Sequence, residues 1–92
     1  MIKNFKHKGL KKFFHTGDTT GISYEHANKL RLILARLEAA CSVQDMALPG
    51  LKLHSLKGSM KSKYAVKVSG NWRVIFSFFG KDAVDVDYLD YP

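Results

Sequence analysis

The sequence is poor in the features that define several protein classes: it has one cysteine, two prolines and no long apolar run. A lone cysteine cannot form a disulfide within the chain, so nothing indicates an oxidising compartment. No apolar segment approaches the roughly 18 residues that a membrane-spanning helix needs, and the first residues do not lead into the apolar core of a signal peptide. We therefore expect a cytoplasmic protein without a membrane partner.

The motifs that hold metals and nucleotide cofactors are missing as well. The sequence contains no CxxC or HExxH pattern, and its four histidines are scattered along the chain. It also lacks a glycine-rich nucleotide loop and a nucleophile-elbow pattern. We expect no metal and no cofactor, which disfavours the enzyme classes that depend on them.

Acidic residues are scarce and unevenly placed. The 92-residue chain has 15 Lys and Arg against 8 Asp and Glu, a net charge of +7. Residues 1–17 carry five lysines, and residues 46–81 carry six lysines and one arginine, with no acid in either segment. Mixed charges would serve solubility equally well, so these segments favour a polyanionic partner such as RNA. The lysines expected to bind it in the second segment are Lys52, Lys61, Lys63 and Lys67.

Two segments in the first half of the chain have helical spacing. Within residues 8–15, apolar side chains at i, i+3 and i+4 lie opposite lysines, which predicts a short amphipathic helix. Residues 24–41 carry a longer stripe of the same kind, which we interpret as core packing, with a coiled-coil interface as the alternative. Cys41 falls on that stripe and is expected to be buried. Residues 2–5 are expected to form an edge strand.

The second half of the chain changes to a period of two. Apolar and polar residues alternate in residues 51–55, 64–69, 72–79 and 84–88, and glycine-containing turns separate the last three segments. This pattern predicts an antiparallel meander whose apolar face the helices must cover. The fold class is therefore α+β, a single domain over residues 1–92 with two N-terminal helices packed on one face of a three- to four-stranded antiparallel sheet.

The remaining groups suit metal-free chemistry on an RNA phosphodiester, because RNA supplies its own nucleophile in the 2′-hydroxyl. On a strand, Lys52 and His54 would point to the same face, and the imidazole could accept a proton near neutral pH. Arg73 is expected to face away from the core, where its planar guanidinium could hold two phosphate oxygens.

Each of these residues also has an ordinary structural interpretation. His54 can be a surface or packing residue, and Arg73 can pair with Asp85 or Asp87 across a hairpin. Tyr88 and Tyr91 can be ordinary sheet aromatics. On the residues alone, the sequence describes a basic α+β domain that binds RNA.

Four segments in order resemble HigB toxins of the RelE/ParE superfamily: residues 1–10 (MIKNFKHKGL), 52–58 (KLHSLKG), 70–76 (GNWRVIF) and 87–91 (DYLDY). The resemblance implies a RelE-like fold and a ribosome-dependent mRNA interferase that cleaves in the decoding site of the small subunit, by attack of the 2′-hydroxyl on the adjacent phosphate. It also implies a HigA-like helix-turn-helix antitoxin as partner, with operator DNA bound only through that antitoxin.

The resemblance also implies site residues. Arg73 and Lys57 would stabilise the transition state, and His54 would orient the substrate or transfer a proton. Tyr91 would stack on or orient a nucleotide, and Asp90 would fix its neighbours. Position 92 belongs to the same set, but family members commonly end in Asp-Tyr-His where this chain has Pro92. Losing an acid–base group there would slow cleavage by roughly 10²–10⁴-fold.

Two other functions remain open on the sequence. One is a ParE-like toxin that poisons DNA gyrase without catalysis, although the combination of His54, Lys57 and Arg73 favours a nuclease. The other is a non-enzymatic module that binds RNA or the ribosome, a hypothesis that Pro92 strengthens for this chain.

Overall fold

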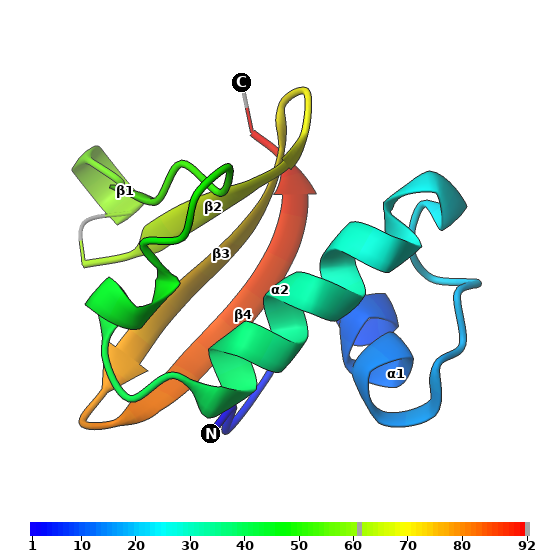
Figure 1. Ribbon diagram of the computed structural model, residues 1–92, viewed down its shortest axis with the longest axis horizontal. Helices are drawn as coiled ribbons and strands as arrows, with labels where there is room; N and C mark the ends of the chain where they lie inside the picture. Colours follow the sequence, from blue (N-terminus) through cyan, green and yellow to red (C-terminus); the bar gives the residue numbers. More distant parts are fainter. Residues whose placement is uncertain (61, 92) are drawn as a thin grey trace.

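The computed structural model describes residues 1–60 and 62–91, and it combines two helices with one antiparallel sheet (Figure 1). The helices are α1 (Lys8–Thr16) and α2 (Ala27–Ala39), and short 3₁₀ turns span Tyr24–His26, Val43–Met46 and Gly58–Met60. The strands are β1 (His54–Ser55), β2 (Tyr64–Ser69), β3 (Trp72–Phe79) and β4 (Asp82–Asp90), paired in the order β1-β2-β3-β4. The predicted α+β class is confirmed, and the antiparallel meander, expected to have three or four strands, has four.

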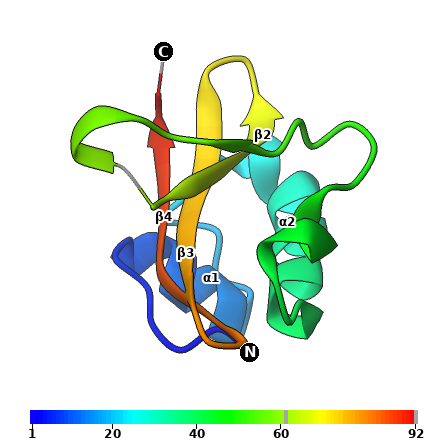
Figure 2. The same ribbon diagram turned by 90° about the vertical axis from the view of Figure 1, so that its left-hand side faces the viewer.

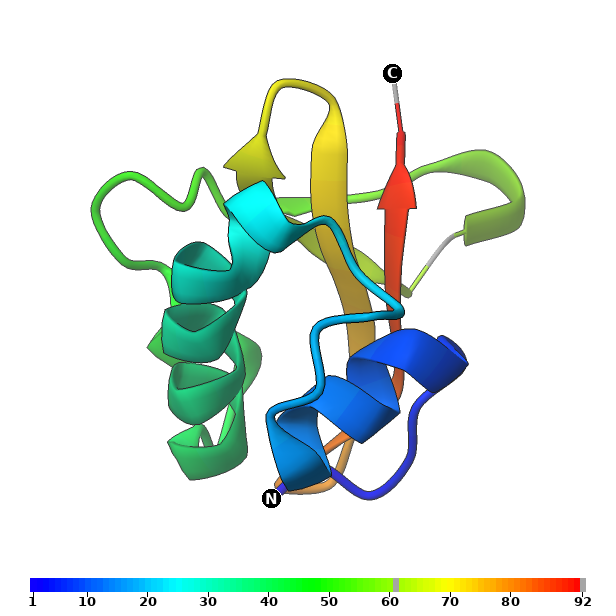
Figure 3. The ribbon, with the colours of Figure 1, turned by 90° about the vertical axis from the view of Figure 1, so that its right-hand side faces the viewer.

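Both helices lie on the same side of the sheet (Figure 3). Each buries the apolar stripe that its sequence spacing predicts, and together with the inward residues of the strands these stripes form one core. Its fully buried large side chains include Leu10, Leu30, Ile33, Leu34, Leu37, Val66, Val74, Phe76 and Val86. No helix of the described residues is both long and apolar enough to cross a membrane.

The second helix is shorter than its apolar stripe, and the prediction that Cys41 is buried is wrong. α2 ends at Ala39, and Ala40 already has an extended backbone conformation. The chain therefore leaves the helix axis before Cys41, whose side chain is exposed and whose backbone N–H donates to Oδ2 of Asp45 at 2.9 Å.

The N-terminal residues do not form the expected strand. They run beside β4 and contact it through two isolated parallel bridges, Ile2 with Ala83 and Phe5 with Val86. The backbone N–H of Ile2 also donates to Oε1 of Glu38 on α2 at 2.7 Å. We call residues 1–6 the N-terminal arm, because hydrogen bonds to β4 and α2 hold this segment without regular secondary structure.

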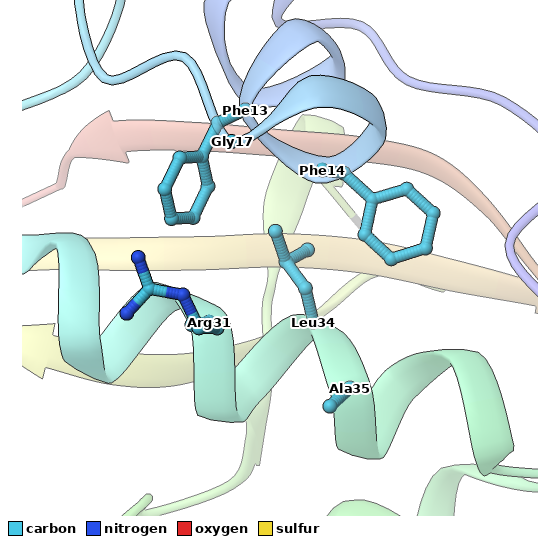
Figure 4. A pocket seen from close by; sticks show the side chains of 6 residues that line it. All are labelled: Phe13, Phe14, Gly17, Arg31, Leu34 and Ala35. Atoms are coloured by element: carbon cyan, nitrogen blue, oxygen red, sulfur yellow. The ribbon is translucent and has the colours of Figure 1, made fainter.

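A pocket of about 300 Å³ opens between α1 and α2. Its walls are apolar apart from Arg31, whose guanidinium carbon lies 5.5 Å from the ring centre of Phe13 (Figure 4). The lining residues are Phe13, Phe14, Gly17, Arg31, Leu34 and Ala35. This pocket lies on the helical side of the protein.

The other side of the sheet is apolar in part, which the alternation did not predict. The segment after β1 folds over it, so that Leu56 packs on Ala65 and Ile75 in a second small buried cluster (Figure 2). Met60, Leu89 and Tyr91 pack against that cluster and are half-buried. We call this side, opposite the helices, the outer face of the sheet.

Candidate functional site

Strand register places three of the expected site residues on the outer face. Lys67 of β2 pairs with Arg73 of β3, which in turn pairs with Leu89 of β4. In the neighbouring row, His54 pairs with Ala65, which pairs with Ile75. Directly paired residues share a face of a sheet, so these rows lie side by side. His54 and Ile75 are separated by two strand spacings of about 4.8 Å each.

The guanidinium of Arg73 is held by the backbone of its own hairpin. Its Nη1 donates to the carbonyl oxygen of Gly70 at 2.6 Å and to that of Trp72 at 3.1 Å. Arg73 pairs with neither Asp85 nor Asp87, so the cross-hairpin ion pair is excluded. Two carbonyl oxygens occupy the two hydrogens of Nη1. No acceptor in the described part of the chain engages Nη2 or Nε, so these donors can bind an anion.

His54 is exposed, and its ring is oriented by one hydrogen bond. Nδ1 lies 3.0 Å from the carbonyl oxygen of Lys52. A carbonyl oxygen only accepts, so Nδ1 carries a proton in this contact. In the neutral ring the lone pair is then on Nε2, which can accept a proton from the solvent side.

The expected strand over residues 51–55 is mostly absent, and this corrects the placement of Lys52. Only His54 and Ser55 pair with β2, and Lys52 has a left-handed φ of 52°. The side-chain alternation of a strand does not apply to such a backbone. The prediction that Lys52 and His54 share a strand face is therefore wrong. Lys52 is exposed and contributes to the site through its carbonyl oxygen.

Lys57 and Lys63 differ in their surroundings. Lys57 is exposed in the segment after β1, where its carbonyl oxygen accepts from the N–H of Met60 at 3.4 Å. Nζ of Lys63 lies 4.0 Å from Oδ2 of Asp85, which offsets part of its charge. Lys61, also expected to bind RNA, lies outside the described residues.

The last residues of the chain divide between the two faces. The backbone N–H of Tyr91 donates to the carbonyl oxygen of Asn71 at 2.8 Å, and its side chain packs on the outer-face cluster. Asp90 pairs with Trp72, whose side chain packs into the main core, so Asp90 belongs to the helical side of the sheet. Its carboxylate is exposed and separate from the row that holds Arg73. Pro92 lies outside the described residues.

A buried polar pair behind the site was not foreseen. Nδ1 of His26 lies 2.6 Å from the hydroxyl of Tyr88, which also accepts from the N–H of Ser23 at 3.3 Å. Burial raises the pKa of Tyr88, so the phenol stays protonated. Tyr88 is thus an aromatic of the main core, whereas Tyr91 packs half-buried against the outer-face cluster. The two groups are 62 residues apart in the sequence, and the packing of the 3₁₀ turn Tyr24–His26 against β4 brings them together.

No group of three or more histidine, cysteine or carboxylate side chains that could hold a metal ion occurs in residues 1–60 and 62–91. The site therefore offers cations, an imidazole and an apolar surface. These groups suit the binding of a phosphodiester and a nucleobase.

Comparisons with known proteins identify the family of the chain. A model of the RelE-like toxin HigB of type II toxin–antitoxin systems matches residues 3–92. The chain is also 36% identical over 91 residues to the Endoribonuclease HigB of Proteus vulgaris, a match that covers 99% of each chain. The fold, the outer-face residues and these matches lead to one conclusion: the chain belongs to the HigB-like family of RelE-like toxins.

Proposed function

We propose that the chain is the toxin of a type II toxin–antitoxin pair and acts as a ribosome-dependent mRNA endonuclease in the cytoplasm. One observation carries the proposal: the ring of His54 and the guanidinium of Arg73 lie on the same face of the sheet, and no hydrogen-bond partner from residues 1–60 or 62–91 engages Nε2 of the ring or Nη2 and Nε of the guanidinium. The name of the Proteus vulgaris relative, Endoribonuclease HigB, supports cleavage of RNA.

The reaction needs no group beyond the protein, water and the RNA. The 2′-oxygen of one nucleotide forms a bond to the adjacent phosphorus, and its proton passes to Nε2 of His54. The bond from phosphorus to the 5′-oxygen of the next nucleotide breaks, and that oxygen takes a proton from water. The products are a 2′,3′-cyclic phosphate and a free 5′-hydroxyl. His54 is the general base in this scheme, because its other nitrogen is engaged by Lys52.

Charge builds on the non-bridging phosphate oxygens in the transition state. The Nη2 and Nε donors of Arg73 are suited to bind two of these oxygens, and the exposed Lys57 would supply a second cation. Lys52, Lys63 and Lys67 would hold neighbouring phosphates along the outer face. Lys61, which lies outside the described residues, is proposed for the same role from the sequence alone.

Tyr91 is suited to orient a nucleotide next to the cleaved bond. Its ring packs beside Leu89 and Met60, so a nucleobase stacked on it would meet an apolar surface as well. Asp90 lies on the other side of β4 and would act by fixing the end of that strand.

The partners follow from the same proposal. The small ribosomal subunit, through its rRNA, would bring the message to the outer face, and the message would be the substrate. A HigA-like helix-turn-helix antitoxin would neutralise the toxin and bind operator DNA on behalf of the pair. No cofactor enters the scheme.

Pro92 is proposed to attenuate cleavage, because proline offers no side-chain proton where relatives carry histidine. The Pro92→His variant should cleave faster, by up to roughly 10²–10⁴-fold if that histidine is the general acid. Growth inhibition and cleavage rate of the two proteins, expressed at equal levels, measure this. Equal activity would refute attenuation and would leave the rest of the scheme intact.

The decisive test maps mRNA 5′ ends on translating ribosomes with and without the protein. Cuts in phase with codons are expected, each leaving a 5′-hydroxyl. Intact message with accumulated double-strand DNA breaks would instead indicate a gyrase poison. Intact message with stalled ribosomes would indicate a binding module without catalysis.

A further inference from the structure

The strand β4 contains one residue more than its partner β3 in the middle of their ladder. Between the pairs that Ile75 and Ser77 make with β4, β3 has one residue and β4 has two. The two residues are Asp85 and Val86, and both face Phe76, which is the arrangement of a β-bulge. Asp85 is the extra residue, and its φ of 53° is left-handed. We call Asp85 and Val86 the β4 bulge.

The β4 bulge decides which side of the sheet the end of the chain faces. Ala83, which precedes the bulge, is buried in the main core. Side chains alternate along a strand, so an unbroken strand would direct Leu89 and Tyr91 to the helical side as well. The extra residue reverses the alternation, so Tyr88 is buried in the main core while Leu89 and Tyr91 pack on the outer-face cluster. The bulge thus brings Tyr91 to the face that we propose binds RNA.

Asn4 of the N-terminal arm holds this bulge by hydrogen bonds. The extra residue of a bulge is left without a partner in the ladder. Oδ1 of Asn4 accepts from the backbone N–H of Asp85 at 3.1 Å, and Nδ2 of Asn4 donates to Oδ1 of Asp85 at 2.8 Å. The carbonyl oxygen of Asn4 accepts from the N–H of Val86 at 3.2 Å. One residue of the arm therefore binds both residues of the bulge.

The residue types suit this contact. Aspartate adopts a left-handed backbone more readily than most residues other than glycine. An amide side chain offers an acceptor for the N–H and a donor for the carboxylate at once, which an aspartate or alanine at position 4 would not. Both side-chain hydrogen bonds are exposed to solvent, so they contribute little to the overall stability of the fold. Their main effect is local, on the register of β4.

We propose that Asn4 is a positioning residue for the outer face, because its side chain holds the β4 bulge and thereby keeps Tyr91 on that face. Its effect on cleavage rests on the proposed nuclease function, whereas its effect on the strand does not. The N-terminal arm would act on Tyr91 through a bulge that lies six residues earlier in β4.

The first test measures single-turnover cleavage of message on programmed ribosomes. Asn4→Ala should be slower by roughly 10–10²-fold, because a displacement of about 1 Å in a positioned group can cost this much. In the background of Tyr91→Ala the same substitution should cost little more, since the ring that Asn4 positions is absent. An equal loss in both backgrounds would refute the inference.

A swapped pair provides the matched control. Asn4→Asp places two carboxylates side by side and should be slow, like Asn4→Ala. Adding Asp85→Asn to it exchanges the amide and the carboxylate, restores both hydrogen bonds and should return the rate close to that of the wild type. A swapped pair that stays as slow as Asn4→Asp alone would contradict the inference. Asn28→Ala, which removes an exposed asparagine that accepts from Arg31 at 2.9 Å, should leave the rate unchanged.

Amide hydrogen exchange locates the effect without an assay of activity. In Asn4→Ala the amides of residues 87–91 should exchange roughly tenfold faster, while those of α2 keep the rates of the wild type. The N–H of Tyr91 is the most direct reporter, because it donates to the carbonyl oxygen of Asn71 at 2.8 Å. Unchanged exchange in residues 87–91 would refute the inference. Equal acceleration in β4 and α2 would indicate a general loss of stability and would refute it as well.

The outcomes separate this inference from the proposed function. If the wild type cleaves message and Asn4→Ala cleaves equally fast, the positioning role is refuted while the nuclease proposal stands. If the wild type does not cleave, the nuclease proposal falls, and the exchange rates alone decide whether Asn4 holds the end of β4.

Discussion

The guanidinium of Arg73 and the carbonyl oxygen of Gly70 are 2.6 Å apart, so the tip of the β2–β3 hairpin orients a candidate catalytic cation. The Arg73→Lys variant keeps a positive charge but loses the planar donors. Cleavage should fall by about 10²–10³-fold, the usual cost of removing one donor from a transition-state oxyanion. The measurement is the single-turnover rate of message cleavage on programmed ribosomes.

The control for this prediction is Arg36→Lys on the surface of α2, which should leave the rate unchanged. Arg73 is only half-buried, so the Arg73 variant should melt close to the wild type. A rate within threefold of the wild type would contradict the assignment of Arg73 to transition-state binding.

A second prediction concerns the nitrogen that His54 leaves free. Asparagine can imitate the Nδ1 contact with the carbonyl oxygen of Lys52, and glutamine reaches closer to the position of Nε2, but neither accepts a proton at neutral pH. Both His54→Asn and His54→Gln should therefore slow cleavage by roughly 10²–10⁴-fold. Binding to ribosomes, measured alongside, should not change. A glutamine variant that retains the rate would assign His54 to substrate orientation.

A third prediction concerns the crossing of α1 over the loop that follows it. A Cβ atom added to Gly9 would lie 2.3 Å from the carbonyl oxygen of Gly21, and one added to Gly21 would lie 2.5 Å from Cα of Gly9. Both neighbours are backbone atoms, which cannot move aside as a side-chain tip can. Gly9→Ala should destabilise the fold by about 1–3 kcal/mol, although alanine is the better helix former. Urea unfolding measures this.

The matched control is Lys11→Ala in the same helix, where the alanine substitution causes no steric clash. That variant should unfold within about 0.5 kcal/mol of the wild type. If Gly9→Ala proves as stable as this control, the two segments separate in solution more than the structure indicates.

A fourth prediction concerns acid. Hydrogen bonds from Thr20, first from its backbone N–H at 2.9 Å, and then from its hydroxyl, together with Lys12, lower the pKa of Asp18 from 3.8 to about 2. A carboxylate whose pKa is lower in the folded chain stabilises the fold fully above pH 3.8 and loses that contribution as the pH falls toward 2. The stability difference between the wild type and Asp18→Asn should therefore shrink across this range. Denaturant unfolding at several pH values tests this, and a constant difference would refute it.

Local patterns in the sequence predicted most of the fold. The helix expected over residues 8–15 is observed as Lys8–Thr16, because its apolar spacing is regular and Gly17 stops it in a left-handed conformation with φ of 81°. The hairpins followed from period-two alternation and glycine turns. The C-terminal end of α2 was predicted too late, at residue 41, because the apolar stripe continues for two residues beyond Ala39, where the helix ends.

The site was less predictable, since it depends on contacts between distant segments. Alternation placed Arg73 on the outer face, as observed, and by the same period Ile75 lies on that face too. Ile75 is buried because the segment around Leu56 folds over it. Nothing in the local pattern shows that a loop will cover the second face, nor that Lys52 takes a left-handed backbone and turns its carbonyl oxygen toward His54.

The N-terminal arm has a consequence for how other molecules can join this protein. It occupies the free side of β4 through the bridges at Ile2 and Phe5. On the opposite border, β1 and the carbonyl oxygen of Leu51, which accepts from the N–H of Lys67 at 2.7 Å, occupy β2. The described sheet thus offers no long unpaired strand for an extended segment of another chain to continue. A partner must therefore bind this protein through side chains, because it cannot add a strand to the sheet. A tag that displaced the first residues would expose the edge of β4 and so favour aggregation.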